Sequence, residues 1–410
     1  MDLDTKILEL EAKACFDFFW DSKHTNTNKN SKGYGLVIDR TNRLDMSSIA
    51  SVGFALSAYV IGVERGYITY DAALERVKGT LKTVYENVPH YKGFLMHFVH
   101  METAERYRNS EISTIDTAIL LNGALTADSY FDDPEVHDIV KKLYDRVEWN
   151  HFVVTLHGKK VFRMAYNPDT KEFIHYWNMP AEQLMMYILA AAHHSIDQDT
   201  ALELYNSFER YAGGYRDYQF IFTPGGALFC YQYSQAWFKF QDYVDVHGFN
   251  WFTNSVNATL ANRAWCIDHK HIYKTFHENS WGLTACDYPN GYHAFGPEPL
   301  GWNHKPEKHN TDGTVAPNAL CGSVPFTPKE CIDALNYLYH NHPKLWGEYG
   351  FKDSYNLEEE PWYCDNYLGI DKGISLLGID NYLHGTTWKY YMKHPFIQKA
   401  IEILKFRRRS

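Results

Sequence analysis

The stretch Ser110–Phe131, SEISTIDTAILLNGALTADSYF, decides how the rest of the chain is interpreted. Ser110 is a suitable helix N-cap and the apolar residues after it recur near helical spacing, so the stretch predicts a single helix. Glu111 would lie in the first turn of this helix, where it could simply complement the helix dipole. Asp116 would stand between apolar residues, where an unpaired carboxylate is costly. We therefore expect a functional role for Asp116.

The composition describes a large folded protein. The chain has 410 residues, of which 45% are hydrophobic and 22% are charged, so it can bury a substantial core. Aromatic residues make up 16%, and their flat rings could contact the faces of sugars, although large cores also use aromatics. The net charge is -10 and the one dense basic run is Arg407–Arg409, so nucleic acid is not an expected partner.

Cysteine usage and the N-terminal segment bear on the compartment. The seven cysteines show no CxxC pair and no zinc-like spacing, which indicates reduced thiols. The first residues are acidic and amphipathic rather than a signal peptide, and no apolar stretch of about 18 residues suggests a membrane span. We expect a cytoplasmic protein with no cofactor and no membrane partner. The oligomeric state does not follow from these patterns.

Apolar helices alternate with amphipathic ones along the chain. We expect helices at residues 4–21, 46–65, 69–87, 110–131, 135–147, 179–194, 200–211, 229–240, 250–268, 316–321, 327–341, 371–393 and 395–406. Short strands are expected within residues 93–99 and 152–176, and residues 272–315 form a long irregular segment of the kind that is usually functional. The pattern predicts one all-α domain over residues 1–410, a toroid with an inner and an outer ring of about six helices each and with loops and short hairpins at one mouth.

Carboxylates stand at several expected junctions between loops and helices. Glycoside hydrolysis generally needs two of them, one protonated and one ionised, and Glu182 and Asp371 stand at such junctions beside the other acids named below. The alternatives are that Glu182 and Asp371 only cap helices and that acids in Gly-rich loops only form turns. The further candidates for substrate binding are Glu111, Glu278, Asp287, Asp312 and Asp365.

Aromatic residues in or beside these segments could form a sugar-binding surface. We expect at least two of the following to line the cavity: Trp177, Tyr233, Trp281, Tyr292 and Trp362. Other chemistries find little support, because the chain has no GxGxxG, Walker, GxSxG or HExxH motif. The pair His193–His194 lacks an organised partner and is expected at the solvated surface.

Eight segments resemble the glucoamylase-like family that includes the endo-β-1,2-glucanases of glycoside hydrolase family 144. They are SIASVGFALSA (48–58), residues 110–131 quoted above, AEQLMMYILA (181–190), YQYSQAWFKF (231–240), NSVNATLANRAWC (254–266), ENSWGLTACDYPNGYHAFGP (278–297), DGTVAPNA (312–319) and DNYLGIDKGISLL (365–377). Their order and spacing hold from about residue 10 to residue 406. The resemblance implies an (α/α)6 barrel that hydrolyses β-linked glucans without a metal, with Glu182 as proton donor and with Asp116 and Asp371 implicated in activity.

The chain departs from the family pattern at three places. Family members commonly carry Ser-Glu at Ala181-Glu182, His at Tyr231, and Asp-Gln-Gly-Pro at Asp371–Ile374. We expect Lys372, in the last of these, to lie near the mouth and to affect the sugar subsites. Transglycosylation and a non-catalytic carbohydrate-binding role remain the alternatives to a hydrolase, and the retained acids favour an enzyme.

The ionisation of Glu182 depends on opposing effects. A position early in a helix would lower its pKa, whereas burial near the aromatic segment His175–Trp177 and a neighbouring carboxylate would raise it. A proton donor needs the raised pKa, so we predict that the raising effects prevail.

Overall fold

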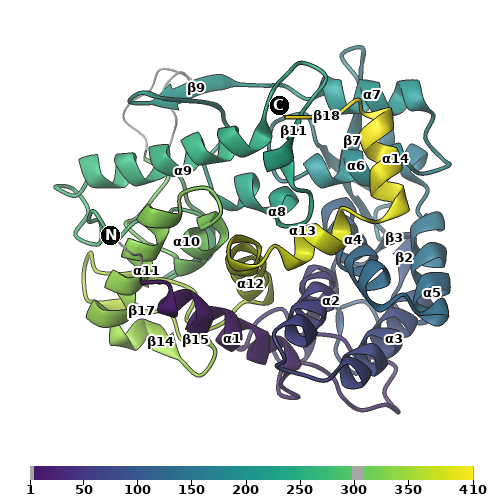
Figure 1. Ribbon diagram of the computed structural model, residues 1–410, viewed down its shortest axis with the longest axis horizontal. Coiled ribbons are helices and arrows are strands. Elements are labelled where there is room, and N and C mark those ends of the chain that lie inside the picture. Colours follow the sequence, from purple (N-terminus) through teal and green to yellow (C-terminus); the bar gives the residue numbers. More distant parts are fainter. Residues whose placement is uncertain (1–3, 298–308, 410) are drawn as a thin grey trace.

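Helices are the main regular secondary structure of the computed structural model, which describes residues 4–297 and 309–409. Fourteen α-helices lie within these ranges: α1 (Lys6–Trp20), α2 (Ile49–Glu64), α3 (Tyr70–Glu86), α4 (Thr114–Phe131), α5 (Pro134–Asp145), α6 (Leu184–Ala191), α7 (Gln198–Ser207), α8 (Phe229–Trp237), α9 (Trp251–Asp268), α10 (Pro317–Ser323), α11 (Pro328–Asn341), α12 (Gly369–Leu383), α13 (Thr386–Tyr391) and α14 (Pro395–Ile403). The predicted alternation divides them into two rings (Figure 1).

The inner ring consists of α2, α4, α6, α8, α10 and α12, whose residues are buried on almost all sides. Consecutive members pack against one another, and α12 returns to α2 and closes the ring. The odd-numbered helices from α1 to α11 lie outside it, and those with a buried and an exposed side cover the inner ring. This arrangement is the (α/α)6 barrel that the sequence predicted.

Helices α2 and α4 approach each other closely because glycine stands at their crossing. A side-chain carbon on Gly53 would collide with the backbone of Ile119 and Leu120, and one on Gly123 would collide with the backbone of Gly53. Each glycine therefore gives the other helix room, as the small residues of this segment indicated.

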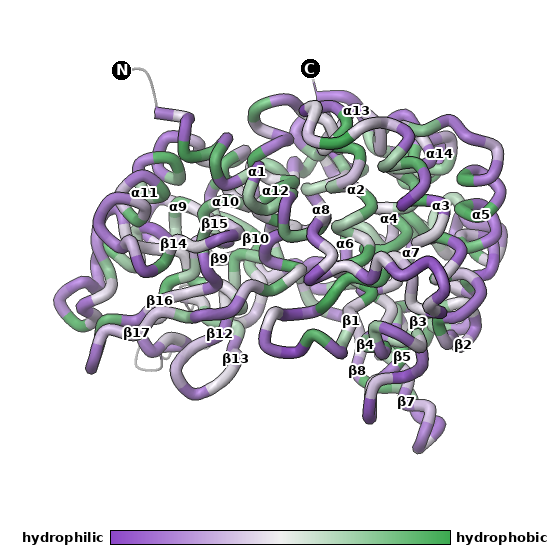
Figure 2. The backbone as a smooth tube through the Cα atoms, turned by 90° about the horizontal axis from the view of Figure 1, so that it is seen from below, coloured by the Kyte–Doolittle hydropathy of each residue, from purple (hydrophilic) through white to green (hydrophobic). Residues whose placement is uncertain are grey.

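The strands are short, and every named pair is antiparallel. They are β1 (Met46–Ser48), β2 (His90–Tyr91), β3 (Phe94–Leu95), β4 (Phe98–His100), β5 (Ile112–Ser113), β6 (Val153–Leu156), β7 (Lys159–Asn167), β8 (Glu172–Tyr176), β9 (Ala212–Tyr215), β10 (Tyr218–Ile221), β11 (Tyr243–Val244), β12 (Ala285–Tyr288), β13 (Gly291–Ala294), β14 (Trp346–Gly347), β15 (Gly350–Phe351), β16 (Tyr355–Asn356), β17 (Trp362–Tyr363) and β18 (Arg407–Arg408). Several, among them β1, β4, β5, β7, β12 and β13, gather at one end of the barrel, at the bottom of Figure 2.

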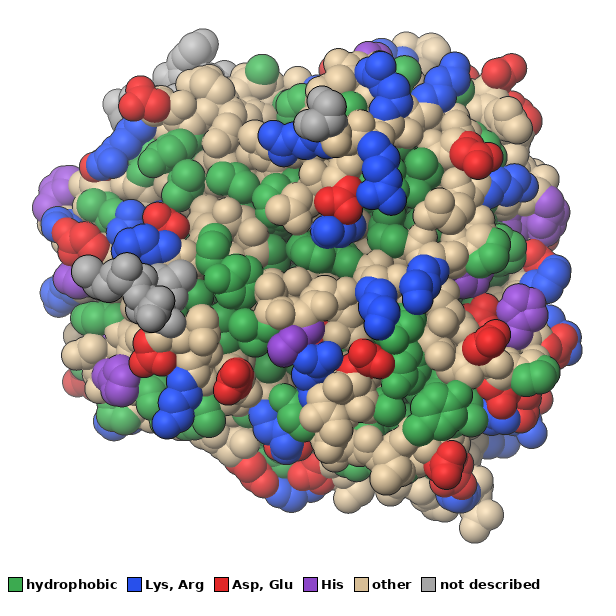
Figure 3. All heavy atoms as spheres, viewed as in Figure 1, with side chains coloured by type: hydrophobic (Ala, Val, Ile, Leu, Met, Phe, Trp, Pro, Cys, Tyr) green, Lys and Arg blue, Asp and Glu red, His purple; other side chains and the backbone are tan. Residues whose placement is uncertain are grey.

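Backbone hydrogen bonds hold the first residues of the inner helices together at this end. The amide of Ile49, at the start of α2, donates to the carbonyl of His97, whose own amide donates to the carbonyl of Glu111 ahead of α4. In the same way Gly369, at the start of α12, donates to the carbonyl of Asp39 ahead of β1. We call this end the mouth. The opposite end faces the viewer in Figures 1 and 3 and carries interspersed basic and acidic side chains.

Three helix boundaries differ from the prediction in ways that matter for the site. Helix α4 begins at Thr114 and its N-cap is Ser113, because Ile112 and Ser113 pair with β7 as strand β5. Glu111 therefore precedes the helix instead of lying in its first turn. Helix α6 begins at Leu184, so Glu182 also lies ahead of its helix.

The third difference divides the helix that was expected over residues 371–393. Gly385 has a φ of 69°, a left-handed conformation that ends the helical path, and α12 and α13 lie on either side of it. Among the described helices, none has the length and apolar character that crossing a membrane would require.

Candidate active site

The three carboxylates proposed for catalysis stand at the first residues of inner helices, at the mouth. Asp116 is the third residue of α4 and Asp371 the third of α12, while Glu182 lies two residues before α6. Tyr233, on α8, has a pKa raised well above its usual value by burial and then by the charges of Asp371, Glu182 and Asp116, among others. The structure therefore brings the three carboxylates together around Tyr233.

Helix α8 holds the turn that carries Glu182. The hydroxyl of Ser234 donates to the backbone carbonyl of Glu182 at 2.6 Å and accepts from the amide of Met185 at 2.9 Å. One turn earlier on α8, the thiol of Cys230 lies 3.6 Å from Oε2 of Glu182 and donates to it. These contacts fix a partly buried carboxyl group at the mouth.

The surroundings of Glu182 favour its protonated form. Burial, helped by the negative charge of Asp116, raises the pKa of Glu182 to about 7, although its own backbone amide and the thiol of Cys230 oppose the shift. The prediction that the raising effects prevail is confirmed. The aromatic segment expected beside Glu182 fits less well. Trp177 is buried, and its indole donates to the hydroxyl of Thr114 at 3.0 Å.

His97 links two of the predicted acids. Its Nδ1 lies 2.7 Å from Oε1 of Glu111 and its Nε2 lies 3.5 Å from Oδ1 of Asp116. Burial alone would lower the pKa of His97, but the charge of Asp116 and the hydrogen bond and charge of Glu111 raise it to about 9. The imidazolium in turn overcomes the effect of burial on Glu111 and lowers the pKa of that carboxyl. Near neutral pH the three groups form a cation between two anions.

Sequence analysis missed Asp353 as well as His97. It lies 4% exposed beside Asp371, which is 6% exposed, and the two carboxyl groups are within hydrogen-bonding reach. Burial and the charge of Asp353 raise the pKa of Asp371 well above its usual value. Burial is also the main reason why the pKa of Asp353 rises to about 6.

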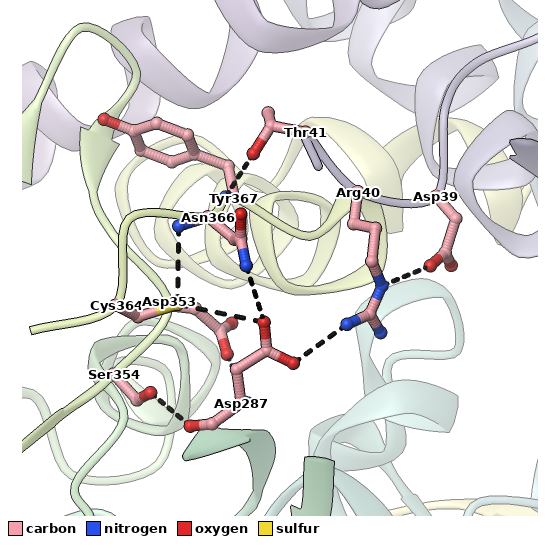
Figure 4. A network of polar contacts seen from close by, with 9 residues as sticks. All are labelled: Asp39, Arg40, Thr41, Asp287, Asp353, Ser354, Cys364, Asn366 and Tyr367. Atoms are coloured by element: carbon pink, nitrogen blue, oxygen red, sulfur yellow. Dashed lines mark hydrogen bonds and ion pairs between the residues drawn. The ribbon is translucent and has the colours of Figure 1, made fainter. Parts of the chain in front are cut away.

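Asp287 lies in strand β12 and organises a polar network beneath this pair (Figure 4). Its Oδ1 accepts from Nη1 of Arg40 at 2.9 Å and its Oδ2 accepts from Nδ2 of Asn366 at 3.1 Å. Its backbone amide donates to Oδ2 of Asp353 at 2.6 Å. Since Arg40 also donates to Asp39 at 2.9 Å, the network joins the loop before β1 to the β12–β13 hairpin.

Two groups of described residues bring potential metal ligands within 4.8 Å of one another. The first is Asp287, Asp353 and Cys364, but hydrogen bonds from Arg40, Asn366 and the backbone already engage these atoms. The second is Asp145, His193 and His194, where Nδ1 of His193 accepts from the amide of Ser195 at 3.0 Å. His193 is buried rather than solvated, contrary to the prediction. We assign neither group as a metal centre.

Two of the expected aromatic residues lie among the carboxylates. They are Tyr233, described above, and Tyr292 on β13, whose phenol pKa is raised by burial and then by Asp371 and Asp353. The Tyr292 side chain remains 44% exposed, and the guanidinium of Arg40 lies 5.5 Å from its ring centre. Trp362 is partly buried in β17, which pairs with β16.

The expectation for Trp281 is wrong. Its side chain is 0% exposed and belongs to the hydrophobic core, so it cannot present a ring to a sugar. Lys372 lies close to Asp371, as expected, but it does not contact a sugar subsite, because its ammonium group points into the protein. It lies 2.7 Å from Oε1 of Glu11 and 2.8 Å from each of the carbonyl oxygens of Tyr349 and Phe351. A side chain with three internal acceptors does not reach a sugar subsite.

Three of the predicted acids have local partners instead of a place in the carboxylate group. Glu278 is exposed and pairs with Lys270 at 2.5 Å. The side chain of Asp365 is 92% exposed and pairs with Lys352 at 2.9 Å. Asp312 accepts from the amide of Thr314 at 2.9 Å, which is the turn-forming alternative considered above.

The comparison with protein families now bears on this geometry. The family model described as "Putative glucoamylase" matches residues 174–395, which is more than half of the chain. The chain belongs to this glucoamylase-like family. The matched residues include Glu182, Tyr233, Asp287, Asp353 and Asp371.

Two solved structures are similar to the chain over nearly its whole length. An endo-β-1,2-glucanase from Chitinophaga pinensis is 26% identical, with a TM-score of 0.85 and coverage of 98% of both chains. A β-1,2-glucanase structure from Parabacteroides distasonis is 25% identical, with a TM-score of 0.84, over 98% of this chain and 60% of that one.

A curated relative, also from Parabacteroides distasonis, is named exo β-1,2-glucooligosaccharide sophorohydrolase (non-reducing end). It is 26% identical over 97% of this chain. The chain spans 58% of the length of that relative.

Proposed function

We propose that this chain is a glycoside hydrolase that cleaves β-1,2-linked gluco-oligosaccharides or glucan by carboxylic acid catalysis. The observation that carries the proposal is Glu182, a carboxyl group at the mouth with a pKa raised to about 7, beside the carboxylate of Asp116. Such a group is protonated often enough at neutral pH to act as a general acid. The substrate class is supported by the β-1,2-glucan relatives named above.

In this reaction Glu182 transfers its proton to the glycosidic oxygen while the bond from that oxygen to C1 breaks. A water molecule supplies the hydroxyl group that C1 gains. The proton that this water loses passes to Asp371. Oδ1 of Asp116 lies 3.5 Å from Nε2 of His97, and the negative charge of Asp116 supports both the raised pKa of Glu182 and the developing oxocarbenium ion.

Tyr292 is proposed as a contact for a sugar ring, because it lies among the carboxylates and remains 44% exposed. Tyr233 is 5% exposed and its ring packs against Phe54 and Phe229, so it is not proposed as a stacking surface. The contribution of the Tyr292 ring should be on the order of 1 kcal/mol. Glu111 and Asp287 are not proposed to touch the sugar. Glu111 acts through His97, and Asp287 acts through Arg40 and Asp353. The seven cysteines are all free, which supports the predicted reducing compartment, the cytoplasm.

The decisive experiment incubates the protein with β-1,2-, β-1,3-, β-1,4- and α-1,4-linked glucans and their oligosaccharides. Hydrolysis of the β-1,2-linked set, lost in Glu182→Gln, is the expected result. Release of a disaccharide from one end would indicate exo action, and a ladder of products would indicate endo action. Products longer than the substrate would instead show transglycosylation. Binding of the β-1,2-linked set without any turnover would refute the enzyme and leave a carbohydrate-binding protein.

A further inference from the structure

Two buried carboxyl oxygens near the mouth lack a hydrogen-bond donor. They are Oδ2 of Asp371, at the start of α12, and Oδ1 of Asp353, in the loop between β15 and β16. Both residues line one small enclosed cavity together with Asn318, and each is more than nine-tenths buried. Ionised carboxylates at these two buried positions would repel each other as like charges.

Nearby cations cannot supply the missing donor, since those among the described residues are engaged elsewhere. Arg40 donates to Asp39 and Asp287. Lys372 lies on the same cavity but is held by Glu11 and two backbone carbonyls. Lys352, also on the cavity, pairs with the exposed Asp365. A proton is the remaining charge carrier small enough to join the two oxygens.

We infer that Asp353 and Asp371 share a single proton between their carboxyl groups, and that Asp353 is a positioning residue through which Asp371 accepts the proton of the attacking water. The second part of the inference, the positioning role of Asp353 in catalysis, rests on the proposed function; we call it the catalytic half. The shared proton itself depends on the geometry of the pair and would exist in an inactive protein as well.

The proton balance of the step is simple. Before attack the pair carries one proton and one negative charge. The shared proton moves to Asp353, which leaves Asp371 ionised toward the mouth. Asp371 then takes the proton that the water loses as its oxygen bonds to C1, and the pair becomes neutral with two protons. One proton leaves to solvent after the products depart, and the pair returns to its starting state.

Other titratable or charged groups face this pair from every neighbouring element, and they set the pH at which it works. Asp287 adds negative charge, whereas Arg40 stabilises the ionised form of Asp353. The other groups nearby are Asp39 before β1, Asp116 on α4, Glu182 before α6, Tyr233 on α8, Cys286 on β12, Tyr292 on β13, Asp312 before α10, Cys364, and, on the cavity itself, Lys352, Tyr367 and Lys372 with Glu11.

The test counts this proton without using substrate. Infrared difference spectra are recorded near neutral pH in a Glu182→Gln background, which removes the other carboxyl group of the mouth that is protonated there. Asp353→Asn and Asp371→Asn should each remove one protonated-carboxyl band of equal intensity, because each leaves a single carboxylate that accepts from an amide. The double variant should remove no more than either single one. Asp365→Asn, a matched change at an exposed carboxylate, should remove none.

A band that survives in Asp353→Asn would assign the proton to Asp371 alone and overturn the sharing. A divalent cation bound stoichiometrically by the purified protein and lost in Asp353→Asn would overturn it as well.

The catalytic half is tested in the otherwise unchanged protein. Asp353→Asn should lower kcat roughly 10- to 100-fold with KM little changed, the size of effect that partners of catalytic groups typically show. Its pH dependence of unfolding should lose the uptake of one proton, while Asp365→Asn keeps both properties. Lost band intensity without any change in kcat would refute the positioning role. Absence of glucan hydrolysis in the parent protein would refute the proposed function, and the infrared result would still decide the shared proton.

Discussion

His97 donates from Nδ1 to Oε1 of Glu111 at 2.7 Å. His97 directly precedes β4 and Glu111 directly precedes β5, which leads into α4, so this bond joins the two segments. The opposite ring nitrogen faces Asp116 at 3.5 Å. One imidazolium thus compensates two carboxylates at the mouth, and a neutral replacement leaves both without a counter-charge. The first prediction follows from this relationship.

We expect His97→Gln to lower stability in a pH-dependent manner. The pKa of His97 is about 9 in the folded protein, above an unfolded value of about 6.5, so protonation stabilises the fold fully below about pH 6.5. This contribution is lost as the pH rises toward 9. The free energy of unfolding should therefore differ between wild type and variant by about 3 kcal/mol near pH 6 and by much less near pH 9.5. Urea unfolding at both pH values measures it. A difference that is the same at both would contradict the raised pKa.

Glu182→Gln should reduce turnover of a natural oligosaccharide by 10²- to 10⁴-fold, roughly 3–5 kcal/mol of activation free energy. A substrate with a good leaving group needs little protonation, so its turnover should fall much less. The wild-type kcat/KM should also decline above about pH 7, where the donor loses its proton. Steady-state kinetics on both substrates check this. Retention of more than about a tenth of the rate on both would exclude Glu182 as the donor.

Cys230 offers a finer test of the same group. Its thiol donates to Oε2 of Glu182 and so favours the ionised carboxylate. Cys230→Ala removes this hydrogen bond, and the alkaline limb of the kcat/KM profile should move to higher pH. Cys266→Ala, at a buried thiol on α9, is the matched control and should leave the limb in place. A shift to lower pH in Cys230→Ala would contradict the assigned hydrogen bond.

The fold was readable because periodicity reports burial. Helices that are apolar on every side, such as α2 and α12, must be enclosed, and amphipathic ones such as α3 must cover them. Strand pairing was not readable. Ser110 looked like an N-cap, but pairing of Ile112 with Tyr166 delays the helix to Thr114 and places Glu111 beside His97. Tyr166 lies 54 residues after Ile112, beyond the reach of local patterns.

The site was predictable in part for the same reason. Asp116 was identified because it breaks an apolar helix near its start, and Asp371 because it enters the last long helix in a segment that resembles the family. Asp353 carries no such signal, since it stands in a short polar loop that resembles many others. The aromatic residues were misjudged because a ring beside an acid in sequence can point either way: Trp281 faces the core, whereas Tyr292 faces the mouth.

Trp281→Ala should therefore act on stability rather than on substrate binding. Truncation of a fully buried tryptophan costs about 3–5 kcal/mol of unfolding free energy. Trp362→Ala, at a partly buried position in β17, is the comparison and should cost about 1 kcal/mol or less. Urea unfolding of both variants, with KM measured on the folded fraction, separates the two roles. A raised KM at unchanged stability in Trp281→Ala would return this residue to the binding surface.

Lys372, on α12, is buried, and its contacts predict a structural role. The ammonium group and the Glu11 carboxylate are 2.7 Å apart with side-chain exposures of 4% and 1%, so neither charge can turn to solvent. Lys372→Met leaves Glu11 with the amide of Phe351 and the thiol of Cys15 as its donors. Removal of one member of a buried pair typically costs about 3–5 kcal/mol.

The loss should appear in the free energy of unfolding, while kcat and KM of the folded enzyme stay near wild type. Glu11→Gln together with Lys372→Met removes the uncompensated charge and should recover a large part of the loss, because much of the penalty is the buried anion itself. Urea unfolding of the two single variants and the double variant forms the cycle that measures the coupling. A Lys372→Met enzyme with normal stability and an altered KM or product pattern would instead place this lysine at a sugar subsite.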